Sequence, residues 1–450
     1  MGFADAYLQK AGLRGKLVDS APHPDLKIIV AIPAYNESGL ERCLDSLFRC
    51  GVSSDSSGDS DSGRKEVIRA EVVVLINAPF NAPDAVLRQN TKTYDAALKW
   101  ISAHPHPFID FHILMDHTFE NKEAGVGLAR KILMDEAVRR FNSIGARNGK
   151  TDGAKDGIIA SMDADAVVDE NYLMAVADHF ESVQPDGSSI YFEHPLSGES
   201  FAPGVYDAVI QYELHLRYYL QSIRSTGYPH AFHTVGSSFA VKAEVYCKEG
   251  GMNRKKAGED FYFIQKIAQR GNFSECNKTR VIPSPRPSDR VPFGTGAAVR
   301  KYLKESVPLN TYNPGPFRML KKLFSGLEIL HSNLNDAPDR FLNSQSEVLL
   351  EFLNSQRFVE ALSEIRQHSA TFPAFQKRFW RWFTMFRMMK FLHYARENGY
   401  PDVPVGEASL ELLTQINPDG VEIPANSRDL GNLLGKFRRI EQFSRNWDTG

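Results

Sequence analysis

The chain has 450 residues, of which 42% are hydrophobic and 24% charged, and its formal net charge is -2. This length allows two or three domains, and the near-neutral balance gives no reason to expect nucleic acid as a partner. The four cysteines form neither a CxxC pair nor a zinc-ligand spacing, which indicates a reduced, cytoplasmic protein. Met1–Lys27 lacks the apolar core of a signal peptide, and no window of about 18 apolar residues predicts a transmembrane helix.

Apolar strands alternate with amphipathic helices in the first part of the chain. Leu26–Pro33 and Glu71–Asn77 are nearly continuous apolar runs, and Phe111–Met115 is a third candidate strand. The Ser-, Asp- and Gly-rich segment 51–63 predicts a mobile surface insertion. This alternation predicts an α/β fold with a doubly wound, mostly parallel sheet and flanking helices. The first strand is followed by Pro-Ala-Tyr-Asn-Glu instead of G-x-G-x-x-G, which excludes a Rossmann dinucleotide site in its usual form.

Two carboxylates, Asp163 and Asp165, end a fourth apolar run that begins at Gly157. Residues i and i+2 of a strand point to the same side, so both carboxylates can face one site at the strand end. Open α/β sheets bind their ligands there, and hard oxygen ligands suit Mg²⁺ or Mn²⁺. A polar strand end with surface acids is the alternative, and the spacing by itself leaves both interpretations open.

An acidic helix start and a proline-rich loop follow in the second half of the chain. Gly258-Glu259-Asp260 opens a helix, and the helix dipole favours acids in a first turn whatever their function. In the extended segment 282–296, Arg286 and Arg290 can either close over a diphosphate or pin the loop to surface acids.

From about residue 297 onward the pattern changes to helices without strands. The sequence therefore predicts an N-terminal extension over 1–25, a domain over 26–296 and a mainly helical C-terminal region over 297–450. One predicted helix, Phe375–Arg396, combines an aromatic stripe with the cations Lys377, Arg378, Arg381, Arg387 and Lys390. Such a stripe usually faces a core, and contact with an anionic membrane surface is the alternative.

Taken in order, these segments resemble the motifs of family 2 glycosyltransferases with the GT-A fold. Val30–Glu37 looks like the opening strand and nucleotide-contacting loop, and Gly125–Arg130 is similar to the G-x-x-x-A-R segment. Asp163-Ala164-Asp165 looks like the DxD metal motif, and Gly258-Glu259-Asp260 matches the ED motif. The resemblance covers residues from about 26 to 275 and implies a GT-A-like domain, followed here by a helical subdomain.

The resemblance implies a role for each matching residue. Asp260 would be the general base, and Glu259 would orient the acceptor or raise the basicity of Asp260. Asp165 with Asp163 would bind Mn²⁺ or Mg²⁺. The expected contacts of the nucleotide sugar are Pro33, Ala34, Tyr35, Glu37, Asn77, Gly125, Arg130, Asp163 and Ala164, to which the proline-rich loop adds Arg286 and Arg290. Many relatives carry a pair of acids where this chain has Ile76-Asn77-Ala78.

The implied activity is metal-dependent, inverting transfer of a sugar from a UDP- or GDP-sugar to a hydroxyl of a saccharide or lipid-linked acceptor. Such an enzyme would serve cell-surface polysaccharide synthesis in the cytoplasm, at most peripheral to the inner face of the membrane. The chain lacks the Q-x-x-R-W motif in the expected place, which argues against a processive, membrane-embedded synthase.

Two other functions fit parts of the same pattern. Asp163–Val167 also fits the D-x-D-x-[TV] motif of haloacid-dehalogenase-like phosphatases, in which Asp163 would be the nucleophile. A non-catalytic sugar-binding protein is the third interpretation, and a large separation between Asp260 and the acidic pair would favour it.

Overall fold

The computed structural model describes residues 2–11, 15–51, 67–121, 124–147, 154–253, 258–290, 293–332, 336–416 and 428–443. The predicted insertion at 51–63 lies, apart from Gly51, outside these residues. The chain divides into two compact units. Unit 1 comprises Met1–Pro195 and His233–Ser284, and unit 2 comprises Leu196–Phe232 and Pro285–Gly450.

Unit 1 is built on an eight-stranded sheet in the order β3-β2-β1-β4-β7-β6-β8-β5. The strands are β1 (Leu26–Ala34), β2 (Arg69–Pro79), β3 (Ile109–Phe119), β4 (Ile158–Ser161), β5 (Val167–Val168), β6 (Gly187–Phe192), β7 (Phe239–Lys242) and β8 (Phe273–Ile282). Strands β7 and β5 run antiparallel to their neighbours, and the other six share one direction. This arrangement confirms the predicted doubly wound, mostly parallel sheet.

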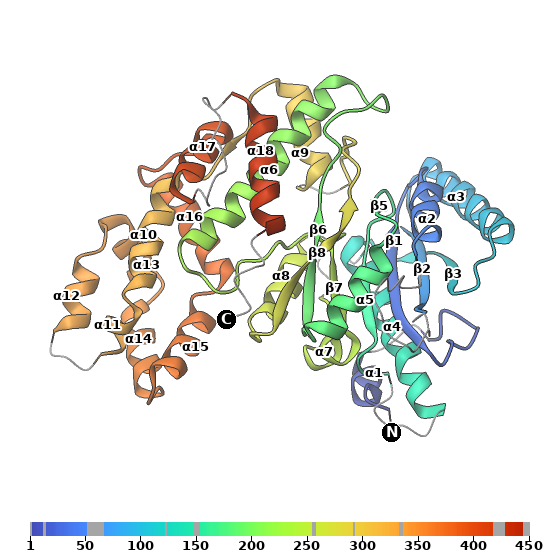
Figure 1. Cartoon of the computed structure of the whole chain (residues 1–450), viewed down its shortest axis with the longest axis horizontal. Helices are drawn as coiled ribbons and strands as arrows, with labels where there is room; N and C mark the ends of the chain where they lie inside the picture. Colours follow the sequence, from blue (N-terminus) through green and yellow to red (C-terminus); the bar gives the residue numbers. More distant parts are fainter. Residues whose placement is uncertain are drawn as a thin grey trace, which may run out of the picture. The chain divides into compact units, whose positions relative to one another are not determined.

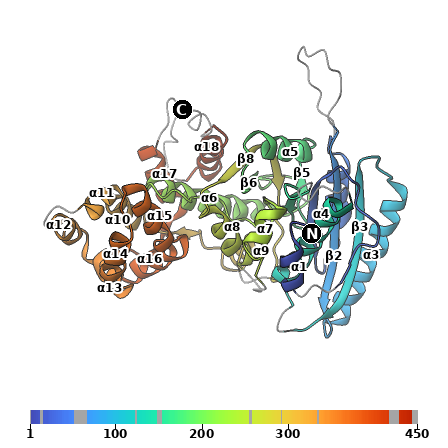
Figure 2. The same cartoon turned by 90° about the horizontal axis from the view of Figure 1, so that it is seen from below.

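Helices cover both faces of this sheet, which explains why its central strands are almost continuously apolar. The helices of unit 1 are α1 (Asp5–Ala11), α2 (Leu40–Phe48), α3 (Asp84–Ala103), α4 (Val126–Arg147), α5 (Tyr172–Ser182), α7 (Ala243–Lys248) and α8 (Glu259–Ala268). Helix α3 lies on one face of the sheet, and α4 with α1 lies on the other (Figures 1 and 2). On that second face, Ile29 and Val73 of the sheet share a buried core with Leu133 of α4 and Ile264 of α8.

The strand order reverses at β1, because β2 and β3 lie on one side of it and β4 on the other. The connections that leave β1 and β4 therefore diverge, and open α/β sheets bind ligands in the crevice outside such a pair of carboxyl ends. The loop after β1 starts at Tyr35, and the chain after β4 carries Asp163 and Asp165. The fold thus brings two of the predicted motifs to neighbouring strand ends.

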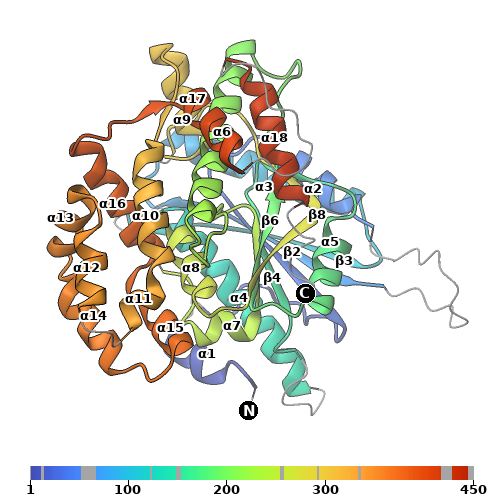
Figure 3. The same cartoon turned by 60° about the vertical axis from the view of Figure 1, so that its left-hand side comes forward.

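Unit 2 is helical in its described residues, apart from the short antiparallel pair β9 (Asn310–Thr311) and β10 (Val403–Pro404). Its helices are α6 (Pro203–Ser225), α9 (Thr295–Glu305), α10 (Pro314–Ser325), α11 (Leu327–His331), α12 (Ala337–Asn343), α13 (Glu347–Ser355), α14 (Phe358–Gln367), α15 (Phe372–Trp382), α16 (Met385–Glu397), α17 (Val405–Ile416) and α18 (Leu430–Phe443). Helix α13 packs against α16 (Figure 3), and α6 packs against both α17 and α18. Among the described residues, no helix combines the length and apolar character needed to cross a bilayer.

The prediction of a single helix over Phe375–Arg396 is wrong, because the helical conformation is interrupted between α15 and α16. Phe383 leaves the helical conformation with ψ near 71°. Thr384 then caps α16, since its hydroxyl accepts a hydrogen bond from the backbone N–H of Arg387 over 3.3 Å. The N-cap at Thr384 therefore divides the aromatic stripe between two helices, although the spacing of the aromatic residues alone predicts one.

A buried group of charges joins α6 to α18 within unit 2. Arg217 Nε donates to Glu213 Oε1 over 2.8 Å, and its Nη1 donates to Glu441. Arg438 Nε donates to the same Glu213 oxygen over 2.7 Å. The side chains of Arg217 and Glu213 are fully buried, so each charge depends on its partner.

Candidate active site

The acidic pair Asp163 and Asp165 lies in a turn and not within strand β4. The strand ends at Ser161, and the backbone N–H of Ala166 donates to the carbonyl of Asp163 over 3.1 Å. The alternation of strand side chains therefore does not orient the two carboxylates, contrary to the expectation from the sequence. The side chain of Asp163 is 42% exposed, so a ligand in solvent can reach it.

Polar side chains behind the loop Tyr35–Glu37 hold it in place. Asn77 Nδ2 donates to the carbonyl of Ala34 over 2.8 Å, and Asn90 Oδ1 accepts the backbone N–H of Asn36 over 2.9 Å. Asn77 is only 4% exposed, so its amide supports the loop from within the protein. A direct contact between Asn77 and the nucleotide stays a prediction.

The loop after β1 and the turn after β4 meet at Cys43 of α2. Cys43 Sγ lies 3.9 Å from the carbonyl oxygen of Asp163. Burial raises the pKa of the Cys43 thiol above its usual range, and the charges of Asp165, Glu37 and Asp163 raise it further. The buried thiol therefore contacts the acidic turn and lies within the electrostatic influence of three predicted site residues.

Arg130, near the start of α4, connects the acidic turn to the start of α8. Its Nη2 donates to Asp163 Oδ1 over 2.7 Å, and its Nη1 donates to Glu259 Oε1. The side chains of Arg130 and Glu259 are 3% and 2% exposed, so this ion pair is buried. Both terminal nitrogens of Arg130 are thus used by protein carboxylates, and its contact with the nucleotide sugar stays a prediction.

Asp260 of α8 lies near the same guanidinium, and Gly236 leaves room for both side chains. A Cβ atom on residue 236 would lie 2.8 Å from Asp260 Oδ2 and 3.0 Å from each Nη of Arg130. The backbone N–H of Phe261 donates to Asp260 Oδ1 over 2.8 Å and fixes the carboxylate. Asp260 and Asp163 therefore lie beside one arginine, and Gly236 is a site residue that the sequence pattern did not reveal.

A left-handed backbone at Gly258, with φ of 72°, turns the chain directly into α8. A residue with a side chain adopts this conformation at a cost, which explains the glycine before Glu259 and Asp260. Both acids stand in the first turn of the helix, as the motif predicts.

Asp163 and Glu259 bind the guanidinium of Arg130, and burial shifts the pKa values of Glu259 and Asp260. Burial raises the pKa of Glu259 to about 7, while Arg130 opposes this shift and Asp260 reinforces it. Burial also raises the pKa of Asp260 above its usual range, again opposed by Arg130. Burial would lower the pKa of Arg130, but Asp163 and Glu259 raise it above its ordinary value. The cluster therefore binds a proton more tightly than isolated carboxylates do.

We expect the stability of the folded protein to fall with rising pH through Glu259. Its folded-state pKa of about 7 exceeds the ordinary 4.5, so between these values the native state binds more protons than the unfolded state. The stabilisation is complete below about pH 4.5 and is lost as the pH rises through about 7. Unfolding temperatures measured from acidic to alkaline pH should decline more steeply in the wild type than in Glu259→Gln. The half-exposed Glu244→Gln serves as control, and equal slopes in all three proteins would contradict the assignment.

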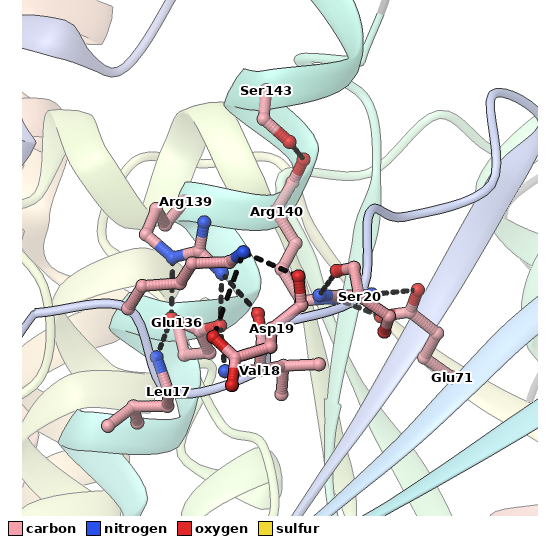
Figure 4. A network of polar contacts seen from close by, with 10 residues as sticks. Leu17, Val18, Asp19, Ser20, Glu71, Glu136, Arg139, Arg140 and Ser143 are labelled. Carbon is pink, nitrogen blue, oxygen red and sulfur yellow. Dashed lines mark hydrogen bonds and ion pairs between the residues drawn. The ribbon is translucent and has the colours of Figure 1, made fainter.

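The N-terminal residues hold α4, the helix of the site arginine, in place (Figure 4). The backbone N–H of Val18 donates to Glu136 Oε1 over 3.1 Å. Arg140 Nη1 donates to the carbonyl of Ser20 over 3.0 Å, and its Nη2 donates to Glu71 Oε1 over 2.5 Å. The segment predicted as an N-terminal extension is thus bonded to the helix that carries the site.

Three further predicted site residues lie in or beside the strand and turn described above, and a fourth lies at the start of α4. Pro33 and Ala34 are the last, buried residues of β1, and Ala164 is buried in the acidic turn. The carbonyl of Gly125 accepts the backbone N–H of Ala129 over 3.2 Å at the start of α4.

Arg286 and Arg290 belong to unit 2. Arg290 contacts the hydroxyl of Ser288 through its backbone N–H at 3.3 Å and through Nε at 3.2 Å. Closure of this loop over a diphosphate stays a prediction.

Asp163 and Asp165 fit a divalent cation that a substrate would help to hold. Within the described part of the chain, no group of three or more His, Cys, Asp or Glu side chains could hold a metal ion by itself. Mg²⁺ commonly takes one or two carboxylates together with phosphate oxygens and water, so two hard oxygen ligands are enough for such a site. Because Arg130 neutralises part of the charge of Asp163, Asp165 is the stronger candidate ligand.

No model of a known protein family matches the chain, and no curated protein matches its sequence. Among solved structures, it is similar to S. aureus TarS 1–349 in complex with UDP-GlcNAc, with 13% identity, a TM-score of 0.35 and coverage of 94% of this chain and 92% of that one. It is also similar to GalNAc-T7 with UDP, GalNAc and Mn²⁺, with 15% identity, a TM-score of 0.33 and coverage of 84% and 58%. Likenesses this distant assign neither a fold nor an activity.

Proposed function

We propose that the chain is a metal-dependent glycosyltransferase that moves a sugar, with inversion, from a UDP- or GDP-sugar to a hydroxyl of a saccharide or lipid-linked acceptor. The observation that supports this most is the position of Arg130 between the acidic turn and the start of α8. Sugar transfer requires neutralisation of a diphosphate and removal of a hydroxyl proton at adjacent places. The carboxylates on the two sides of Arg130 have the chemistry for these two tasks.

Asp165, together with Asp163, would hold Mn²⁺ or Mg²⁺, which supplies a Lewis acid for the departing diphosphate. Asp260 accepts the proton of the acceptor hydroxyl while the acceptor oxygen bonds to the anomeric carbon. The bond from that carbon to the diphosphate oxygen breaks, and its electron pair leaves with the diphosphate. The raised pKa makes Asp260 a stronger base than an ordinary aspartate, and Arg130 favours its ionised form.

Glu259 has a different role in this proposal. It is buried and bound to Arg130, so it positions the guanidinium and does not touch the acceptor.

The two alternative functions have less support. A phosphatase would need Asp163 as a free nucleophile, whereas its Oδ1 is bound by Arg130 and its motif follows the fourth strand of the domain. A large separation between Asp260 and the acidic pair would favour a non-catalytic sugar-binding protein. Asp260 instead lies beside the arginine that binds Asp163.

Thermal unfolding with nucleotide sugars tests the proposal. A UDP- or GDP-sugar with Mn²⁺ is expected to stabilise the protein by about 2.7 kcal/mol at a hundred times its Kd. Asp165→Ala should lose the part of this stabilisation that depends on the metal, and Glu170→Ala, an exposed acid near the same turn, should keep it. Stabilisation by vanadate without a response to nucleotide sugars would favour the phosphatase instead.

Within this proposal the protein works in the cytoplasm, where it contributes to cell-surface polysaccharides. Direct assays of sugar transfer with a panel of UDP- and GDP-sugars and candidate acceptors would identify the donor sugar and the acceptor.

A further inference from the structure

One face of α15 carries exposed cations without acids near them in the sequence. Between Phe372 and Arg396 the chain has six Lys or Arg residues and no Asp or Glu. Lys377, Arg378 and Arg381 are exposed and occupy positions i, i+1 and i+4, which lie on one side of a helix. These three residues, the α15 cation face, make no hydrogen bond or ion pair with any other described residue.

The opposite side of α15 is anchored in the core of unit 2. Phe375, Phe379 and Phe383 are fully buried, and their rings stack at centroid distances of 6.3 and 5.9 Å. Phe324 of α10 packs against Phe383 at 5.0 Å and against Trp380 at 4.9 Å. Phe375, Phe379 and Phe383 therefore belong to the core of unit 2, and their packing keeps the cation face on the outside of the unit.

Half-buried aromatic rings border further cations where α15 meets α16. The guanidinium carbon of Arg387 lies 3.8 Å from the ring centre of Trp382, and Lys390 Nζ lies 4.9 Å from that of Phe386. Apolar rings below charged heads suit the boundary between lipid headgroups and acyl chains.

We propose that the α15 cation face docks unit 2 onto the surface of a bilayer that contains anionic phospholipids. Each Lys or Arg near such a surface strengthens binding by about fivefold, so three fixed cations give a sizeable attraction. The charge arises locally, because the whole chain has a net charge of -2. Because these three cations lie together on one side of α15, their attraction to an anionic surface orients the docking.

Nucleic acid fits this face less well than lipid does. Proteins that bind single strands offer open aromatic faces on which bases stack. Here Phe375 and Phe379 are buried, and Arg387 already lies over Trp382.

Flotation of the full chain with vesicles tests this docking without any assay of sugar transfer, so it is independent of the function proposed above. Vesicles of phosphatidylcholine with roughly one third phosphatidylglycerol should bind the protein, and vesicles of phosphatidylcholine alone should not. Raising the salt from about 0.1 M to about 1 M shortens the screening length from about 10 Å to about 3 Å and should release it.

Substitution of the three cations identifies the face. The triple variant Lys377→Gln/Arg378→Gln/Arg381→Gln should lose roughly a hundredfold in vesicle affinity. Arg300→Gln/Lys301→Gln/Lys304→Gln removes the same charge from exposed positions of α9 and should keep the affinity. Unchanged unfolding temperatures of both variants show that they are folded.

Three outcomes would overturn the proposal. They are equal binding to both kinds of vesicle, equal loss in the two triple variants, and binding of single-stranded nucleic acid or polyphosphate by the cation face without binding to anionic vesicles.

Discussion

Asp260→Asn is expected to reduce the rate of sugar transfer by about 10²- to 10⁴-fold, the usual contribution of a positioned general base. The amide has the shape of the carboxylate but cannot accept the proton of the acceptor hydroxyl. Its Oδ1 atom can still accept the backbone N–H of Phe261, which now lies 2.8 Å away, so the start of α8 should keep its structure. Initial rates with donor and acceptor measure the loss, and calorimetric titration of the donor measures binding.

Donor binding separates this role from a purely structural one. We expect the Kd of the donor to stay within a few-fold of the wild type, because the proposed role of Asp260 is to accept the proton of the acceptor hydroxyl and not to bind the donor. Asp178→Asn, an exposed position on α5, serves as the matched control and should keep both values. If donor affinity collapses while the rate at saturating donor stays unchanged, Asp260 is a donor contact and not the base.

Arg130→Met is expected to cost about 3–5 kcal/mol of folding free energy, because it leaves Glu259 buried without its cation. The loss should be larger at alkaline than at acidic pH, since Glu259, with its pKa of about 7, becomes neutral at low pH. Sugar transfer should fall as well, because Asp163 loses the same partner. Urea unfolding at two pH values measures the stability difference.

A half-exposed arginine of unit 1 provides the control for this substitution. Arg270 pairs with Asp186 at 2.5 Å and with Glu249 at 2.7 Å, but 32% of its side chain is exposed. Arg270→Met should therefore cost about 1 kcal/mol or less. Equal losses in Arg130→Met and Arg270→Met would mean that the buried cluster does not stabilise the site.

Local patterns were enough to predict the sheet and to place the motifs on it. Apolar runs such as those of β1 and β2 are long and bounded by turns, and their alternation with helices fixes a parallel arrangement. Because parallel strands share the direction of their carboxyl ends, the motifs after β1 and β4 had to meet at one edge.

Contacts between distant segments could not be predicted in the same way. Gly236 follows His233, Thr234 and Val235 without any local signal, and its importance appears only when Asp260 and Arg130 lie against its backbone. The turn at Asp163 was missed for a related reason. Strand alternation was extended beyond Ser161, whereas a hydrogen bond from Ala166 ends the extended conformation.

The buried charges between α6 and α18 join two segments of unit 2 that are separated in the sequence by residues of unit 1. Residues 196–232 are synthesised before unit 1 is complete, yet Arg217 finds its partner Glu441 only 224 residues later. A fragment that starts at Pro285 would leave Arg438 and Glu441 facing no partner from α6, and a fragment that ends at Ser284 would carry the buried charges of α6 without their counter-ions. During translation, the buried charges of α6 therefore gain their partners only after α18 has been synthesised. Cleavage of the chain at Ser284 would separate α6 from α18.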